Sequence, residues 1–140
     1  MMRRMLLILA ALGSPLAAQN APDMFDSMRS APLSPGQWSY AASLTGSEAR
    51  FGLSFSIRCD RATRRVTLLR GDAAPAAMTI GTDLAVRTLA ADGVVGSTDA
   101  VLDAIAFSRG RFIVSGGGGV SRLVLPASPE AARSIEDCRN

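Results

Sequence analysis

Five arginines in the middle of the chain form its densest source of binding chemistry. They are Arg58, Arg61, Arg64, Arg65 and Arg70. The residues between them predict a hairpin, so several guanidinium groups would share one edge of a sheet. Guanidinium forks match the oxygens of phosphates and carboxylates, so the cluster predicts a surface for an anionic partner. Exposed charge also protects an edge strand from aggregation, and this structural role stays open.

The chain contains neither histidine nor lysine, and this excludes several catalytic mechanisms. Serine nucleophiles activated by His or Lys cannot be built. Zinc and other transition metals lack imidazole ligands, and cysteines joined in a disulfide could not act as ligands or nucleophiles. We therefore expect a protein that is not an enzyme and has no metal site or cofactor.

Asp99 and Asp103 are the remaining candidates for catalysis. They lie four residues apart on a predicted helix, so their carboxylates share one face. Such a pair could serve glycoside cleavage or calcium binding. Asp99 is equally explained as a residue that begins the helix and Asp103 as a solvated one. A carboxylate-based glycan-active enzyme is therefore the least favoured function.

The run Gly116–Gly119 does not predict a phosphate-binding loop, because no Lys-Ser or Lys-Thr follows it and no helix begins there. Strand-like segments flank the run, which therefore predicts a flexible hairpin tip. A loop that becomes ordered on a ligand or partner is the functional alternative.

Residues 1–18 have the organisation of a secretory signal peptide. Arg3 and Arg4 are followed by a short apolar run, and Ala17 and Ala18 supply small residues before a cleavage site. The apolar run is too short for a permanent membrane span, which needs about 20 residues. We expect a periplasmic or secreted protein of the bacterial envelope, with no transmembrane segment after cleavage.

Cys59 and Cys138 are the only cysteines. In an exported protein such a pair usually forms a disulfide, and two buried thiols are the alternative. A bond closing a loop of roughly 80 residues would stabilise the fold by about 4 kcal/mol on the chain-entropy model. The spacing is not that of a CxxC redox motif, so the expected bond is structural.

The charge balance argues against nucleic-acid binding. All 15 basic residues are arginines, and loss of Arg3 and Arg4 with the leader leaves 13 against 12 acidic residues. A nearly neutral domain lacks the basic surface of a nucleic-acid binder. The expected partner is an envelope protein or an anionic component of the cell wall or outer membrane.

Alternating segments predict a single β-rich domain at residues 37–140, after a flexible tether at residues 19–36. The clearest pattern lies at residues 48–59, where large apolar and small or polar side chains alternate, and it predicts one half-buried strand. Its apolar side is formed by Phe51, Leu53, Phe55, Ile57 and Cys59. Further strands are expected at residues 38–44, 65–70, 78–80, 84–89, 111–115 and 121–125.

Two helices complete the predicted fold. One begins at residues 97–99 and ends at Gly110, and the other begins at Ser128. The second helix places Ile135 and Cys138 on one face, so the disulfide would attach it to the strand at residues 48–59. The expected fold is mainly β: a small antiparallel β-sandwich or barrel-like sheet with one short inserted helix and a C-terminal helix stapled by a disulfide.

The stretch Ser108-Arg109-Gly110-Arg111-Phe112, together with the cysteine pair, resembles the small secreted inhibitors of C-type lysozyme. Those proteins are exported β-barrels closed by a disulfide from an early strand to the C-terminus. Their later segment with Trp and Lys has no counterpart here. The resemblance implies an inhibitor of a cell-wall hydrolase, with Arg109 or Arg111 entering the acidic cleft of the enzyme.

The sequence favours a non-enzymatic interaction module that binds an envelope component or protein partner through the arginine hairpin or the tether. The hydrolase inhibitor is the alternative.

Overall fold

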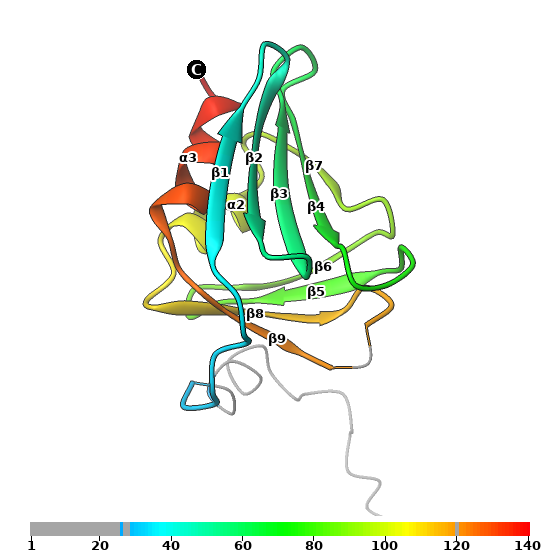
Figure 1. The fold of residues 1–140 in the computed structure, drawn as a ribbon, viewed down its shortest axis with the longest axis vertical. Coiled ribbons are helices and arrows are strands. Elements are labelled where there is room, and N and C mark those ends of the chain that lie inside the picture. Colours follow the sequence, from blue (N-terminus) through cyan, green and yellow to red (C-terminus); the bar gives the residue numbers. More distant parts are fainter. Residues whose placement is uncertain (1–25, 27–28, 120) are drawn as a thin grey trace, which may run out of the picture.

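The computed structural model describes residues 26, 29–119 and 121–140 and shows a mainly β fold (Figure 1). The expected signal peptide and half of the expected tether lie outside the described residues. Two antiparallel sheets, a short inserted helix and a C-terminal helix attached by a disulfide make up the described chain, which confirms the predicted fold class. No helix in this part of the chain has the length and apolar character required to cross a bilayer.

The first sheet has five strands in the order β1-β2-β3-β4-β7, and each neighbouring pair is antiparallel. Successive side chains point to opposite faces. One face, the inner face, carries fully buried residues such as Ala49, Ile57 and Leu68. We call the opposite face the outer face. The strands are β1 (Trp38–Ala42), β2 (Gly46–Phe51), β3 (Phe55–Asp60), β4 (Arg65–Arg70) and β7 (Val94–Gly96).

The segment at residues 48–59 is two strands joined by a tight turn, so the prediction of one strand is wrong. β2 ends at Phe51, β3 begins at Phe55, and the two phenylalanines pair across the hairpin. Both are buried, whereas Leu53 between them is 84% exposed. Gly52 has a φ of 54°, in the left-handed region that glycine adopts without strain. The alternating pattern conceals this turn because Phe51 and Phe55 stay on the same face.

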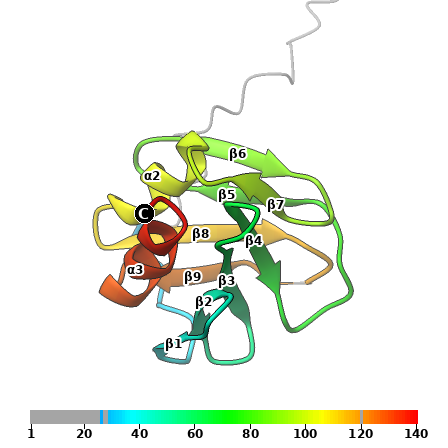
Figure 2. The same ribbon diagram turned by 90° about the horizontal axis from the view of Figure 1, so that it is seen from above.

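The second sheet has four antiparallel strands in the order β6-β5-β8-β9. In Figure 1 the first sheet faces the viewer and the second lies beneath it, whereas Figure 2 shows the second sheet face-on. The two sheets therefore cross rather than stack flat on one another. The strands are β5 (Met78–Gly81), β6 (Val86–Leu89), β8 (Arg111–Gly116) and β9 (Leu123–Pro126).

An aromatic cluster joins the two sheets. The ring of Trp38 on β1 lies 5.5 Å from the ring of Phe51 and 6.2 Å from that of Phe112 on β8, measured between centroids. Its Nε1 donates a hydrogen bond of 2.8 Å to the carbonyl of Pro126 on β9. Aromatic packing and one partly buried hydrogen bond thus connect the first and second sheets at Trp38.

The inserted helix α2 (Ala100–Ala106) begins as predicted but ends earlier. The carboxylate of Asp99 accepts a hydrogen bond of 3.0 Å from the N–H of Val101, so Asp99 is the N-cap. Phe107 is the C-cap, and Gly110 lies in the following loop with a φ of 81°. The prediction that Gly110 ends the helix is therefore wrong, although this glycine does provide a left-handed turn before β8.

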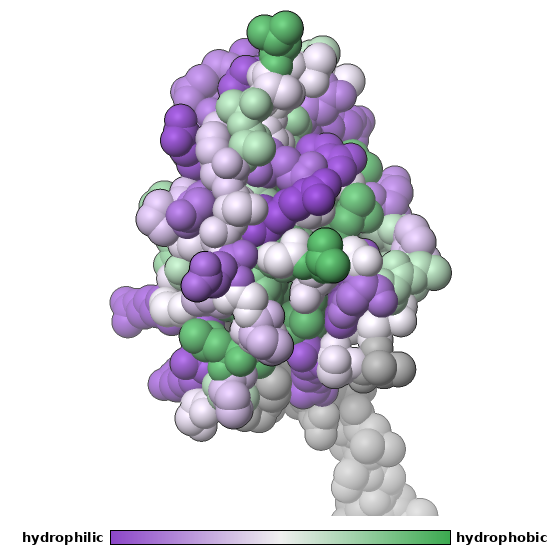
Figure 3. Space-filling model, in the orientation of Figure 1, coloured by the Kyte–Doolittle hydropathy of each residue, from purple (hydrophilic) through white to green (hydrophobic). Residues whose placement is uncertain are grey.

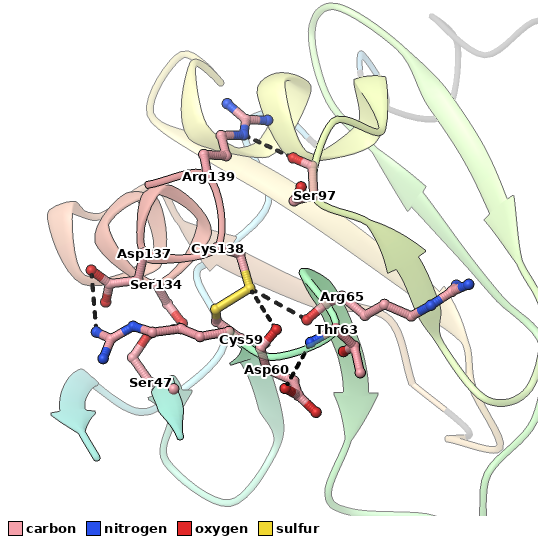
Figure 4. Close-up of a disulfide and its surroundings, with 12 residues drawn as sticks. Ser47, Cys59, Asp60, Thr63, Arg65, Ser97, Ser134, Asp137, Cys138 and Arg139 are labelled. Atoms are coloured by element: carbon pink, nitrogen blue, oxygen red, sulfur yellow. Dashed lines mark hydrogen bonds and ion pairs between the residues drawn. A yellow bond between two sulfur atoms is a disulfide. The ribbon is translucent and has the colours of Figure 1, made fainter. Parts of the chain in front are cut away.

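The C-terminal helix α3 (Pro129–Asp137) begins at the predicted N-cap, Ser128, whose Oγ accepts a hydrogen bond from the N–H of Ala131. The helix packs on β1, β2 and β3. A disulfide joins Cys138, just after α3, to Cys59 on β3, with 5.5 Å between the Cα atoms (Figure 4). The predicted pairing and its place in the fold are confirmed.

Residues 31–36, predicted as the end of the tether, lie beside β9. The N–H of Ser34 donates to the carbonyl of Val124, and the Oγ of Ser34 accepts from the N–H of Val124, each at 2.9 Å. Arg111 on β8 donates to the carbonyl of Ala31 at 2.5 Å. These contacts cover part of the edge of β9, where unpaired backbone groups would otherwise face solvent.

Candidate functional site

The five arginines of the predicted cluster do not share one surface. Arg70 is only 6% exposed and its side chain lies on the inner face of the first sheet. The others are exposed and lie on the outer face or on the β3–β4 turn. These are Arg58, Arg61, Arg64 and Arg65.

Arg70 supports the glycine-rich tip between β8 and β9. Its Nε and Nη2 donate to the two oxygens of Asp72 at 3.0 and 2.9 Å. Its Nη1 donates to the carbonyls of Gly116 and Ser121 at 2.9 and 2.8 Å. All three guanidinium nitrogens donate within the chain, and the tip expected to be flexible is tied to β4.

The outer face carries two exposed arginines that are held by one glutamate. Glu48 on β2 lies opposite Arg58 on β3 and two residues before Arg50. Its Oε2 accepts a hydrogen bond of 2.9 Å from the Nε of Arg58, and its Oε1 accepts one from the Nε of Arg50. The terminal nitrogens of both guanidinium groups make no hydrogen bond within the described residues. We call Glu48, Arg50 and Arg58 the outer-face triad.

The electrostatics of the triad keep Glu48 ionised. Partial burial disfavours its charge, but the hydrogen bonds from Arg50 and Arg58 outweigh this effect and hold the pKa of Glu48 below its usual value. Glu48 is only 18% exposed, whereas the side chains of Arg50 and Arg58 are 55% and 52% exposed. The carboxylate therefore lies beneath the two guanidinium groups and orients them toward solvent.

Two shallow depressions flank the outer-face triad. One has a volume of about 330 Å³ and includes Leu53, Ser56 and Leu69 in its lining. The other, of about 310 Å³, lies toward the β1–β2 turn. Glu48 and Arg58 line both depressions, so the two hollows follow one line along β2 and β3. Figure 3 shows this face, with hydrophilic side chains gathered in its middle. The shape suits an extended ligand.

The β3–β4 turn adds positive charge at the end of the sheet near the disulfide. Arg61 donates to the carbonyl of Ser43 at 3.3 Å and lies 3.9 Å from a carboxylate oxygen of Asp137. The side chains of Arg64 and Arg65 form no ion pair within the described residues. Arg64 has a φ of 51°, a backbone conformation that favours glycine.

Arg109 and Arg111 lie at the start of β8 and differ in exposure. The side chain of Arg109 is 91% exposed, and its Nε lies 3.6 Å from a carboxylate oxygen of Asp83. Arg111 is half-buried and donates to the carbonyl of Ala31. Of the two, only Arg109 projects far enough to enter a cleft on a partner.

The two aspartates considered for catalysis are engaged by different arginines. Asp99 pairs with Arg87 on β6 at 3.1 Å, and Asp103 pairs with Arg139 at 2.8 Å. Both carboxylates therefore connect α2 to neighbouring elements. Over residues 26, 29–119 and 121–140, no group of three or more His, Cys, Asp or Glu residues is arranged to hold a metal ion.

Arg50 is absent from the predicted cluster although it belongs to the site. A single strand at residues 48–59 would separate Arg50 from Arg58 along the chain, whereas the turn at Gly52 brings them to neighbouring strands. The spacing of Glu48 and Arg50 is the sequence signal that could have identified Arg50, since residues two apart in a strand share a face and can form an ion pair there.

No protein-family model matches the chain, and no match was found among curated proteins or solved structures. Functional conclusions therefore rest on the geometry of the site.

Proposed function

We propose that this protein is an exported, non-enzymatic binding module that holds an extended anionic polymer of the bacterial envelope on its outer face. The observation that carries the proposal is the outer-face triad. Glu48 uses only the Nε of Arg50 and Arg58, so the terminal nitrogens of both remain available to a partner. Two oriented guanidinium groups above a shallow hollow can bind successive carboxylate or phosphate groups.

The surroundings of the triad support an elongated ligand. The two depressions continue along β2 and β3 to either side of Arg58. Ser56 lines one depression and Thr67 lies opposite Arg58 on β4, and both offer hydroxyl groups suited to a glycan. Arg64 and Arg65 extend the positive charge toward the β3–β4 turn. Their attraction for an anionic polymer should be strongest at low ionic strength, because salt screens exposed charges.

Export is part of the proposal. The pattern at residues 1–18 supports it, and so does the Cys59–Cys138 disulfide, because such bonds persist mainly in oxidising compartments. In that setting two polymers present suitable anions: the peptide stems of peptidoglycan carry carboxylates, and lipopolysaccharide carries phosphates.

The test is co-sedimentation of the mature protein with purified peptidoglycan sacculi and, separately, with vesicles containing lipopolysaccharide. We expect saturable binding to one of the two, weakening as salt rises. The double variant Arg50→Gln/Arg58→Gln should weaken binding about tenfold or more, since each charge-assisted hydrogen bond is worth roughly 1.5–3 kcal/mol.

Arg87→Gln is the matched control. Arg87 is 50% exposed and forms a single ion pair with a carboxylate, as Arg58 does, but it lies on β6 of the second sheet. Its substitution should leave binding unchanged. Two results would refute the proposal. One is that the protein binds neither polymer. The other is that Arg50→Gln/Arg58→Gln loses no more affinity than Arg87→Gln/Arg122→Gln, a double variant with the same net charge.

An inhibitor of a cell-wall hydrolase is the second candidate, and the exposure of Arg109 is the observation in its favour. The purified oxidised protein would then inhibit a muramidase stoichiometrically, and Arg109→Glu would remove the inhibition. Unchanged muramidase activity in the presence of the wild-type protein would dismiss this candidate without affecting the first.

A further inference from the structure

A second pocket lies at one end of the four-stranded sheet, away from the outer-face triad. It has a volume of about 510 Å³ and is lined by Arg29, Asp83, Leu84, Arg109 and Arg111. The volume lies in the range of about 300–1,000 Å³ that is common for small-molecule sites. Its three guanidinium groups make this lining rich in hydrogen-bond donors for an anion, whereas the carboxylate of Asp83 is an acceptor.

Separate segments of the chain build this pocket. The β5–β6 turn is closed by Thr82, whose Oγ1 accepts hydrogen bonds from the N–H groups of Leu84 and Ala85 at 3.1 and 3.0 Å. This turn leaves Leu84 63% exposed at the pocket. Asp83 accepts a hydrogen bond of 3.3 Å from the backbone N–H of Arg109, which joins the turn to the segment before β8.

The positions of the arginines are fixed to different degrees. Arg111 is anchored by its Nη1 bond to the carbonyl of Ala31, which leaves its other nitrogens without a partner in the described chain. Arg29 is paired with Asp26 at 2.7 Å. Among the described residues, the side chain of Arg109 is held only by the 3.6 Å contact with Asp83, and an ion pair this exposed contributes little energy. Arg109 can therefore turn toward a ligand at small cost.

We infer that this pocket binds a phosphate group whose apolar substituent packs against Leu84. A phosphate offers several oxygens to forked donors from different directions, which suits guanidinium groups approaching from the N-terminal segment and from β8. Leu84 provides an apolar surface beside the charges. The inference uses none of the outer-face residues and is independent of the proposed polymer binding, although the hydrolase-inhibitor candidate also uses Arg109.

The phosphate could belong to a water-soluble ester or to a lipid headgroup, and three probes distinguish these sources. The ¹⁵N-labelled protein is titrated with inorganic phosphate, butyl phosphate and a short-chain phosphatidic acid below its micelle concentration. We expect saturable shifts of the amide signals of Leu84, Arg109 and Arg111. About tenfold tighter binding of the phosphatidic acid, lost in Leu84→Ser, would identify a lipid headgroup. Tighter binding of butyl phosphate than of inorganic phosphate, without further gain from the acyl chains, would identify a soluble ester.

Two variants with opposite expected signs test the role of the charges. Arg109→Gln should weaken phosphate binding about tenfold or more. Asp83→Asn should strengthen it severalfold, because the amide oxygen still accepts from the Arg109 N–H while the competing negative charge is gone. Both substitutions should leave the fold intact, since the side chain of Arg109 is 91% exposed and asparagine at position 83 keeps the shape and the hydrogen-bond acceptor of Asp83.

Arg122→Gln is the control for net charge, since Arg122 is exposed and precedes β9 at the end opposite to Arg111. The affinity of the Arg122→Gln variant for each probe should equal that of the wild-type protein. The inference is overturned if no probe gives saturable shifts at the pocket, or if Arg122→Gln weakens binding as much as Arg109→Gln.

Discussion

Arg70 and Arg58 belong to the same hairpin, yet the structure uses them in opposite ways. Arg70 points to the inner face, where all three nitrogens bind Asp72 and the carbonyls of the glycine-rich tip. Arg58 points to the outer face, where its Nε donates to Glu48 and its terminal nitrogens have no partner among the described residues. The difference shows that the number of donors used within the chain separates a structural arginine from one available to a partner.

Substitution of Arg70 is the most severe test of this comparison. Arg70→Met should destabilise the fold by about 3–5 kcal/mol, because Asp72 and the carbonyls of Gly116 and Ser121 lose their donor. Urea unfolding followed by circular dichroism measures the loss. Arg58→Gln is the control and should cost less than about 1 kcal/mol. Equal stability of the two variants would show that Arg70 is not the support of the tip.

A methyl group at Gly119 should have the next largest effect. A Cβ built there lies 2.1 Å from Cζ of Arg70, so the guanidinium must move. Gly119→Ala should therefore cost about 1–3 kcal/mol, the usual range for overpacking. In the Arg70→Ala background the same change should cost much less, and a double-mutant cycle measures the difference. Additive effects would mean that Arg70 and the tip are not coupled.

Acid should weaken both arginine–carboxylate arrangements. Hydrogen bonds from Arg70, against a smaller opposing effect of burial, hold the pKa of Asp72 below its usual value, and the pKa of Glu48 is lowered too. A carboxyl group with a lower pKa in the folded state stabilises the fold above its unfolded pKa, and this stabilisation is lost as the pH falls through the folded value. The urea midpoint should therefore fall as the pH drops below about 4–5.

Asp72→Asn isolates the contribution of the Arg70 region, because its amide does not titrate. The fall of the urea midpoint with acid should be shallower than in the wild type. The effect should be modest, since the side chain of Asp72 is 38% exposed and solvent screens its charge. An identical pH dependence in wild type and variant would contradict the lowered pKa of Asp72.

The smallest change in stability should come from a variant that makes Arg58 resemble Arg70. Thr67 lies opposite Arg58 on β4, so Thr67→Glu offers a carboxylate to its terminal nitrogens. A cross-strand pair of this kind contributes about 0.2–1 kcal/mol, so the fold should be unchanged or slightly more stable. Binding of the anionic polymer should nevertheless be lost, which co-sedimentation measures. Thr67→Gln is the uncharged control, and retained binding in Thr67→Glu would argue against the outer face.

Much of this fold is predictable from local signals. Ser128 followed by Pro129 identifies the start of α3. The Cys59–Cys138 bond is predictable because the two cysteines of an exported protein usually form a disulfide. The turn at Gly52 is not visible in the alternation of apolar residues, because a three-residue connection preserves the pattern on both sides. Closeness in the sequence likewise suggests that Arg70 and Arg58 belong to one surface cluster. The alternation of buried and more exposed residues from Arg65 to Arg70 instead places Arg70 on the buried side of β4.

The site is less predictable than the fold because it depends on pairing between strands. Arg50 and Arg58 become neighbours only through the register of β2 and β3 around Glu48. The pocket at Arg109 requires the β5–β6 turn to meet the start of β8, two segments separated in the chain by β6, β7 and α2. Neither arrangement follows from local spacing, since strand order and register are properties of the whole sheet.

The position of Trp38 has a spectroscopic consequence. The chain contains one tryptophan and one tyrosine, and both lie on β1. The indole contacts Phe51 of the first sheet and Phe112 of the second, so its fluorescence reports the junction between the two sheets. Separation of the sheets would admit water to the ring and shift its emission to longer wavelength, even while both sheets kept their hydrogen bonds. Tryptophan emission can thus follow the opening of this junction independently of the loss of secondary structure.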